Sequence, residues 1–159
     1  MEHQLTITYR EYASAAELPA AEAELVEAAI RATDGSYSPY SRFRVGAALR
    51  LADGTIVCGS NQENAAYPSG LCAERTAIFA ASAQHPQQRD YEALAIVGRN
   101  AEGTLCEASP CGACRQVLLE YEQRQHHPLR VLCYTSGGGI REVDSVRDLL
   151  PFAFELSAG

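Results

Sequence analysis

The chain has 159 residues, of which 47% are hydrophobic and 21% are charged, and its formal net charge is −7. This composition is ordinary for a single globular domain with a buried core. The acidic balance argues against a nucleic-acid partner, which requires clustered Lys and Arg. No apolar stretch reaches the length of a membrane span. We therefore expect neither a nucleic-acid nor a membrane partner, whereas a small neutral ligand is compatible with this charge.

The first third of the chain predicts strands and one long helix. Residues 5–12 (LTITYREY) alternate in polarity and predict a short edge strand or an extended arm. Residues 19–32 predict a helix with Pro in its first turn and an apolar stripe along it. Residues 43–49 alternate as a strand, and the Asp-Gly pair in residues 52–55 predicts a hairpin turn. Residues 56–59 are then the returning strand.

The rest of the chain predicts helices and strands in alternation. Residues 61–70 form a polar loop that leads into Cys72. After it we expect, in order, a helix at 72–83, a buried strand at 93–98, a helix at 111–121, strands at 130–134 and 140–143, and a short helix capped by Asp144 or Ser145 that ends at Leu150. A hairpin followed by such alternation predicts a mixed sheet with helices on both faces.

The six cysteines are Cys58, Cys72, Cys106, Cys111, Cys114 and Cys133. The first residues, MEHQ, do not begin a signal peptide, so we expect a reducing cytoplasm, where a Cys-x-x-Cys pair indicates a metal or redox site. Cys58 and Cys133 lie in apolar strand patterns and are expected to be small core residues. Cys106 has no assigned role.

Cys111 and Cys114 form a Cys-x-x-Cys pair at the start of a predicted helix. There the unpaired N–H groups and the helix dipole favour the thiolate, which is a preferred zinc ligand. Cys72, at the start of another predicted helix, supplies a third ligand, and three protein ligands with an open position are typical of catalytic zinc. A structural zinc site and a redox dithiol remain alternatives for this pair.

Glu74 lies two residues after Cys72, where a general acid/base would be needed. The alternative is that Glu74 is an ordinary first-turn residue whose negative charge is stabilised by the helix dipole. Arg75 and Arg115 each follow a site residue directly and would offset the negative charge of three thiolates, with Gln116 in a similar orienting role. The alternative for both arginines is a solvated helix surface.

Four blocks of the sequence together resemble the cytidine deaminases of the short-chain, three-cysteine, homotetrameric type. They are YSPYSRFRVGAAL (37–49), NQENAAYPSGLCAERTAI (61–78), SPCGACRQ (109–116) and LLPFAF (149–154). The resemblance covers the chain from about residue 18, which divides it into an arm or edge strand at 1–17 and a deaminase domain at 18–159. It implies an α/β fold, a three-layer α/β/α arrangement around a mixed five-stranded sheet, and one Zn²⁺ per subunit.

The resemblance also assigns residues to the site. It implies that Cys72, Cys111 and Cys114 bind the metal and that Glu74 is catalytic. The residues that it places at the substrate or at subunit boundaries are Phe43, Asn61, Glu63, Ala66, Tyr67 and Phe154. From the residues alone, Asn61 and Glu63 suggest an Asx-type turn with a solvated Glu, and Phe43 a core residue of a strand. Phe152 has no assigned place.

The function that the resemblance implies is zinc-dependent hydrolytic deamination of cytidine and 2′-deoxycytidine to uridine and 2′-deoxyuridine plus ammonia, in pyrimidine salvage. Glu74 would move a proton from water to ring N3 and later to the departing amine. One alternative is a nucleoside-antibiotic deaminase of the blasticidin type. Another, of a different class, is a non-catalytic module with structural zinc, against which Glu74 beside an open metal position is the main evidence.

Overall fold

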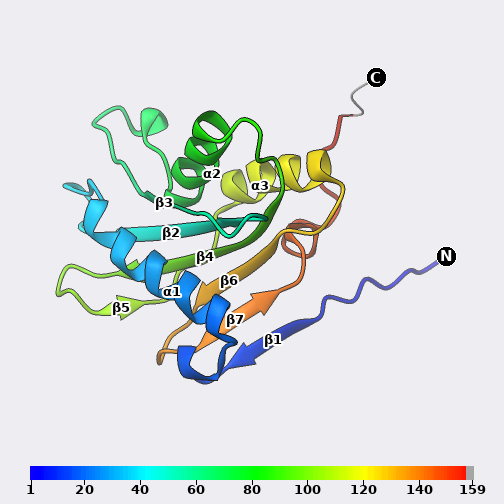
Figure 1. Ribbon diagram of the computed structural model, residues 1–159, viewed down its shortest axis with the longest axis horizontal. Helices are drawn as coiled ribbons and strands as arrows, with labels where there is room; N and C mark the ends of the chain where they lie inside the picture. Colours follow the sequence, from blue (N-terminus) through cyan, green and yellow to red (C-terminus); the bar gives the residue numbers. More distant parts are fainter. Residues whose placement is uncertain (157–159) are drawn as a thin grey trace.

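The computed structural model describes residues 1–156, which form a sheet covered by helices on both faces (Figure 1). Helix α1 (Ala20–Ala32) packs on one face, whereas α2 (Ala73–Gln84) and α3 (Gly112–Gln125) pack on the other. The predicted three-layer α/β/α class is therefore confirmed. Residues 157–159, the end of the expected 18–159 domain, lie outside the described residues.

Over residues 1–156 the sheet has seven strands, so the predicted count of five was wrong. The strand order is β1-β7-β6-β4-β2-β3, with β5 paired to β4 alone. The strands are β1 (Tyr9–Tyr12), β2 (Arg44–Leu51), β3 (Ile56–Ser60), β4 (Tyr91–Arg99), β5 (Leu105–Cys106), β6 (Arg130–Tyr134) and β7 (Ile140–Val143). The β4–β6 pair is parallel and the other pairs are antiparallel, which makes the sheet mixed.

The two additional strands have different explanations. β1 occupies the second half of the stretch 5–12, which was expected to be a strand or an arm, and it pairs with β7 at the sheet edge. β5 is only two residues long and carries no alternation that could predict it. It pairs with Gly98 and Arg99, beyond the part of β4 that β6 reaches.

The continuous apolar run of β4 is buried on both faces of the sheet, as expected. Leu94 and Ile96 pack in the core beneath α2 and α3, whereas Ala93, Ala95 and Val97 pack against α1. All five side chains are at most 1% exposed. Burial of these side chains is what holds the helical layers onto the sheet.

Three local predictions need adjustment. Helix α3 continues past Tyr121 to Gln125, because the Glu122 carboxylate is buried and accepts hydrogen bonds from the backbone N–H groups of Leu129 and Val146. The short helix after Ser145 is a 3₁₀ helix, Val146–Leu149. Cys58 is exposed, because β3 is the outermost strand. Among residues 1–156, no helix is both long and apolar enough to cross a bilayer.

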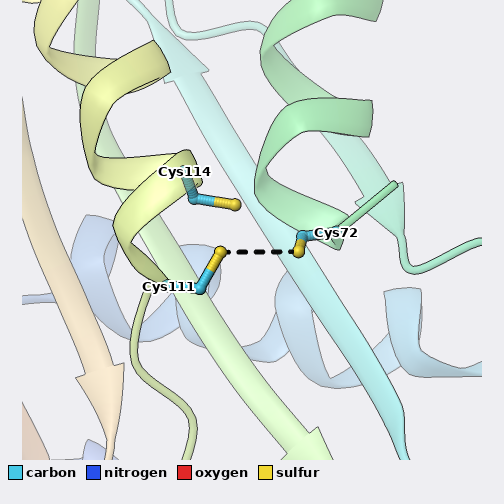
Figure 2. Close-up of side chains that lie close together, drawn as sticks. All are labelled: Cys72, Cys111 and Cys114. Carbon is cyan, nitrogen blue, oxygen red and sulfur yellow. Dashed lines mark hydrogen bonds between the residues drawn. The ribbon is translucent and has the colours of Figure 1, made fainter. Parts of the chain in front are cut away.

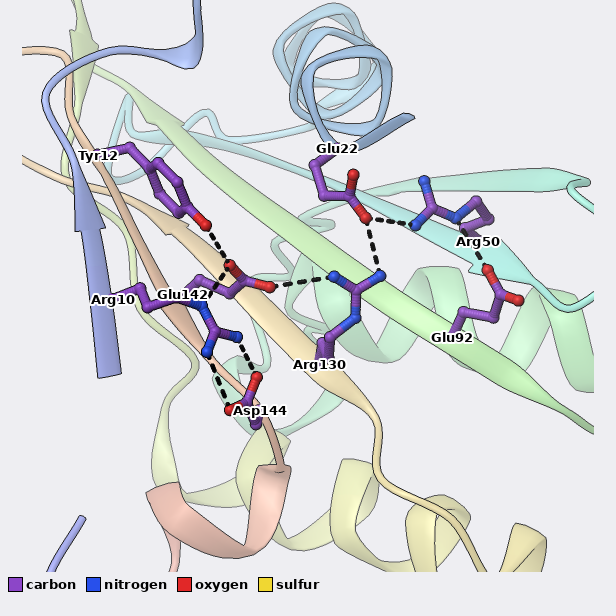
Figure 3. Close-up of polar contacts among 8 residues, drawn as sticks. All are labelled: Arg10, Tyr12, Glu22, Arg50, Glu92, Arg130, Glu142 and Asp144. Carbon is purple, nitrogen blue, oxygen red and sulfur yellow. Dashed lines mark hydrogen bonds and ion pairs between the residues drawn. The ribbon is translucent and has the colours of Figure 1, made fainter. Parts of the chain in front are cut away.

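A chain of ion pairs crosses the α1 side of the sheet (Figure 3). Arg130 on β6 donates to Glu142 on β7 at 3.1 Å and to Glu22 on α1 at 2.8 Å, and Glu22 also accepts from Arg50 on β2 at 3.0 Å. Burial alone would raise the pKa of Glu142, but hydrogen bonds from Arg10, Tyr12 and Arg130 outweigh it and hold the pKa below its usual value. Such paired buried charges fix one arrangement of the elements that carry them, since breaking one pair leaves a buried charge alone.

Glycine at position 59 lets α2 approach the sheet closely. A Cβ atom built on Gly59 would lie 2.5 Å from the backbone oxygen of Ala73 in α2. Because the obstacle is helix backbone, no side-chain rotation relieves it. The contact therefore sets the distance between β3 and the first turn of α2, which begins next to Cys72.

Replacing Gly59 with Ala should lower the free energy of unfolding by about 1–3 kcal/mol, the usual cost of forcing extra volume into a packed core. Urea unfolding of Gly59→Ala and the parent protein measures the difference. Gly112→Ala is the matched control, since a Cβ there meets no atom within 4 Å. It should leave stability unchanged or raise it by at most about 1 kcal/mol. Equal effects of both substitutions would contradict this account of Gly59.

Candidate active site

Three cysteine side chains converge between the starts of two helices (Figure 2). Cys72 is the N-cap residue of α2, Cys111 is the N-cap residue of α3, and Cys114 lies in the first turn of α3. Their Sγ atoms all lie within 4.8 Å of one another, and Cys72 Sγ is 3.7 Å from Cys111 Sγ. Neither N-cap side chain bonds to the backbone of its helix. The sulfurs are therefore available as ligands of a common ion.

The three thiols affect one another's acidity. The neighbouring Cys114 thiol donates a hydrogen bond that lowers the pKa of Cys72 to about 5, against the opposing effect of burial. A hydrogen bond from Arg75 also lowers the pKa of Cys72. The Cys72 thiolate, followed by burial, in turn raises the pKa of Cys114. One thiolate thus forms readily and makes the next one costly. A bound divalent cation would favour all three thiolates, and thiolate sulfur is the donor type that zinc prefers.

Glu74 lies beside the cysteine cluster and is only 3% exposed. Burial, with a smaller contribution from the Cys72 thiolate, raises the pKa of Glu74 to about 7. A carboxyl group with such a pKa can both accept and donate a proton near neutral pH. Glu74 lines the same pocket as Cys72 and Cys111, so the sequence-predicted acid/base candidate and metal-ligand candidates are brought together.

The two arginines expected near the ligands occupy different positions. Arg75 Nη2 lies 3.7 Å from Cys72 Sγ, so its positive charge does face a thiolate. Arg115 instead donates to the carbonyl oxygens of Pro110 and Leu149, both at 2.8 Å. It therefore acts on the backbone that precedes Cys111 and ties it to the C-terminal segment. Gln116 reaches the same segment, donating to the Phe154 carbonyl at 3.0 Å.

A pocket of about 730 Å³ opens next to the cysteines. The predicted residues Phe43, Asn61, Glu63 and Tyr67 line it together with Glu74. A volume of this size suits a small organic ligand. The tertiary structure thus joins the loop 61–70 to the helix starts in one cavity.

The side chains of Asn61 and Glu63 both bind residues 36–45, which lead into β2 and include its first residues. Asn61 Oδ1 accepts from Val45 N at 2.7 Å and from Ser36 Oγ at 2.6 Å, while Nδ2 donates to Phe43 O at 2.9 Å. An amide NH₂ group has two hydrogens, so one N–H of Asn61 stays available for a ligand. Both side chains thus bind residues 36–45, so Asn61 does not form the local Asx-type turn that the residues alone suggested.

Glu63 holds the turn at residues 40–41. Its carboxylate accepts from Tyr40 N at 2.8 Å and from the Ser41 hydroxyl. Hydrogen bonds from the Ser41 hydroxyl and from the backbone N–H groups of Tyr40 and Ser41 keep the pKa of Glu63 below its usual value. Ser36, Tyr40 and Ser41 were not among the predicted site residues, and their one signal in the sequence is their place in the block 37–49 or directly before it.

Phe43 is half-buried at the pocket and depends on a glycine in the neighbouring strand. A Cβ atom on Gly98 would lie 2.8 Å from Phe43 Cζ. Gly98 therefore gives room for the ring, a role that its place in an apolar strand did not reveal. Phe43 is consequently not a simple core residue, since one side of its ring borders the cavity.

The residues expected near subunit boundaries are exposed in the single chain. Tyr67 is 75% exposed and packs edge-on against Tyr40, with ring centroids 6.0 Å apart. Phe154 is 68% exposed and does not line the pocket of its own chain, and the same holds for Ala66. Phe152 is 99% exposed and adopts a φ of 55°.

Comparisons with known proteins agree with this geometry. The model of a family described as "Cytidine and deoxycytidylate deaminase zinc-binding region" matches residues 19–127. A cytidine deaminase of Halalkalibacterium halodurans is 44% identical over 130 residues, covering 82% of this chain and 91% of its own. One of Mycobacterium tuberculosis is 38% identical, covering 80% and 85%. A crystal structure of cytidine deaminase from Burkholderia pseudomallei is similar with a TM-score of 0.71 and 43% identity, covering 82% and 97%.

Replacing Cys111 with Ser should lower the zinc content of the purified protein markedly, because a hydroxyl oxygen is a poor substitute for a thiolate on this metal. Atomic absorption of protein purified without chelator measures it. Cys106→Ser is the matched control, because Cys106 lies on β5, away from the cluster, and should retain the parental zinc content. Full occupancy in Cys111→Ser would refute the ligand assignment.

Proposed function

The chain belongs to the cytidine and deoxycytidylate deaminase family, and we propose that it is a zinc-dependent hydrolase that converts cytidine and 2′-deoxycytidine into uridine and 2′-deoxyuridine plus ammonia. The observation that carries the proposal is the joint placement of three converging thiols and a buried carboxyl group in one pocket. A structural-zinc module would need neither the pocket nor Glu74. Pyrimidine salvage is the process in which we place the reaction.

Cys72, Cys111 and Cys114 would hold one zinc ion per subunit. When bound, zinc supplies Lewis-acid activation of a water molecule near neutral pH. Arg75, 3.7 Å from Cys72 Sγ, offsets part of the negative charge of the three thiolates. Arg115 keeps Cys111 in place through the Pro110 carbonyl.

Glu74 would carry the protons of the reaction. Addition of water to C4 of the cytosine ring needs a proton acceptor for the water and a proton donor for ring N3. The Glu74 carboxyl group can do both in turn. It can then take the proton of the new C4 hydroxyl group and give it to the amino group, which leaves as ammonia while the C4 carbonyl forms. Burial raises the pKa of Glu74, so the carboxyl group is neither permanently ionised nor permanently protonated near pH 7.

The sugar and the base would be held by pocket residues that precede α2 in the sequence, namely Phe43, Asn61 and Glu63. Phe43 borders the cavity with an aromatic ring suited to stacking on the base. The remaining N–H of Asn61 and the Glu63 carboxylate are suited to binding the sugar hydroxyls. Both side chains also form hydrogen bonds to residues 36–45. They would therefore be fixed in position before the sugar binds.

We also propose a homotetramer with active sites shared between subunits, working in the cytoplasm. The exposed Tyr67 and Phe154 support this proposal, since large aromatic side chains are usually covered. All six cysteines are free thiols, which suits a reducing compartment. Light scattering tests the oligomer, and a fully active monomer would exclude it.

Glu74→Gln should retain zinc and fold but lose turnover, because glutamine keeps the shape of the side chain and cannot transfer protons. Loss of a general acid/base typically costs about 10²–10⁴-fold in rate. The decrease in absorbance of cytidine on deamination measures kcat, with zinc content and the unfolding midpoint determined in parallel. Near-parental turnover with zinc bound would rule out the proposed role of Glu74.

Cytidine should be a far better substrate than free cytosine, since without the sugar Asn61 and Glu63 lose their ligand partners. Sites that hydrogen-bond a hydroxyl reject the analogue lacking it by up to about 10⁴-fold or more, and a smaller but large ratio is expected in this open pocket. Cytidine monophosphate should also react poorly, because Glu63 and the net charge of −7 disfavour a dianion. Specificity constants for the three compounds test this, and similar values for cytidine and cytosine would exclude a sugar site.

A further inference from the structure

Strand β1 lies at the edge of the sheet, where backbone pairing and side-chain contacts hold it in place. It pairs with β7 on one side, and over residues 1–156 no strand pairs with its other side. Arg10 binds Glu142 at 3.2 Å and also Asp144, and Tyr12 donates to Glu142 at 3.0 Å (Figure 3). Glu11 accepts from Arg141 at 2.9 Å. β1 therefore presents an unpaired backbone edge in a defined orientation, which is a ready template for another strand.

The segment that precedes β1 runs away from the body of the protein (Figure 1). Residues 1–8 are exposed throughout, and in the described chain they make no hydrogen bond to any other residue. Leu5 is 61%, Ile7 is 40% and Tyr9 is 54% exposed. Three large apolar side chains at alternate positions share one face when the segment is extended, and of these Tyr9 is contacted by Arg141, whose Cζ lies 5.5 Å from the ring centroid.

The residues of this segment are symmetric about Ile7. The sequence Leu5-Thr6-Ile7-Thr8-Tyr9 has Thr on both sides of Ile7 and a large apolar residue beyond each Thr. In an antiparallel pair of two such segments centred on Ile7, Ile7 faces Ile7, Leu5 faces Tyr9 and Thr6 faces Thr8. These are the apolar and Thr–Thr cross-strand pairs that stabilise antiparallel sheets.

Other centres give poorer pairs. A centre at Thr6 sets Tyr9 against His3, and a centre at Thr8 sets Leu5 against Glu11. The centre at Ile7 sets Leu5, Ile7 and Tyr9 opposite one another and sets His3 against Glu11, which are not like charges. A segment that complements itself in this way selects a second copy of the same chain over an unrelated strand.

We propose that residues 5–9 form an antiparallel strand pair with the same residues of a second copy of this chain, with Ile7 facing Ile7 across a two-fold axis. This contact is isologous, as is usual for two identical subunits. It lies outside the region matched by the family, residues 19–127, and so adds an interface to the catalytic domain without depending on the proposed reaction.

Cysteine cross-linking tests the pairing and its register. Opposite residues in an antiparallel pair have Cα atoms about 4.5–5.5 Å apart, within the disulfide range of about 4.4–6.8 Å. Ile7→Cys, oxidised with oxidised glutathione, should give several-fold more covalent dimer on a non-reducing gel than the parent protein or Thr8→Cys alone. A mixture of Thr6→Cys and Thr8→Cys should also cross-link, because position 6 faces position 8, whereas neither variant should do so alone.

Different outcomes would contradict the pairing itself and its register. No dimer from Ile7→Cys above the parental level would overturn the proposal, as would equal yields from Ile7→Cys and Thr8→Cys, which indicate random collisions of a loose segment. Strong cross-linking of Thr6→Cys or Thr8→Cys alone would refute the register centred on Ile7. The unfolding midpoint of each variant, expected to equal that of the parent, verifies that the domain is folded.

Discussion

Charge repulsion among three thiolates is the constraint on which the site depends. Sulfur atoms within 4.8 Å of one another cannot all be ionised cheaply, since the first thiolate raises the pKa of its neighbour. The helix starts and Arg75 offset part of this charge, and a cation bound by the three sulfurs would offset the rest. Burial, with a smaller contribution from the Cys72 thiolate, raises the pKa of Glu74 to about 7. The acidity of Glu74 is thus linked to the charge of the cysteine cluster.

The fold meets this constraint by fixing two helix starts against one sheet. Gly59 lets the first turn of α2 approach β3 closely, and Arg115 ties the backbone before α3 to the C-terminal segment. On the other face of the sheet, the ion pairs of Glu22 and Glu142 connect α1 to β2, β6 and β7. The helices that carry the cysteines therefore rest on a sheet whose opposite side is held by specific pairs of charges, so small displacements of the ligands are resisted.

Two side chains of the pocket also hold its backbone in place. Asn61 and Glu63 hold the backbone of residues 36–45 with most of their hydrogen-bonding capacity and still face the cavity. Side chains that are fixed in this way would leave a ligand in the pocket little freedom to bind in another orientation. In contrast, Tyr67 and Phe154 stay largely exposed in the single chain.

The sequence by itself determined the class of the fold, because the alternation of strands and helices and the apolar run of β4 depend on local periodicity. It also determined the metal-ligand and acid/base candidates, since Cys-x-x-Cys, Cys72 and Glu74 carry chemistry that few other residue types can supply. Only the tertiary structure decided what depends on contacts between distant segments. These are the two-residue β5, the exposure of Cys58 on an edge strand, the room that Gly98 leaves for Phe43, and the direction of Arg115 toward backbone carbonyls instead of sulfur. No periodicity encodes such contacts, because each depends on which residues the sheet order brings together.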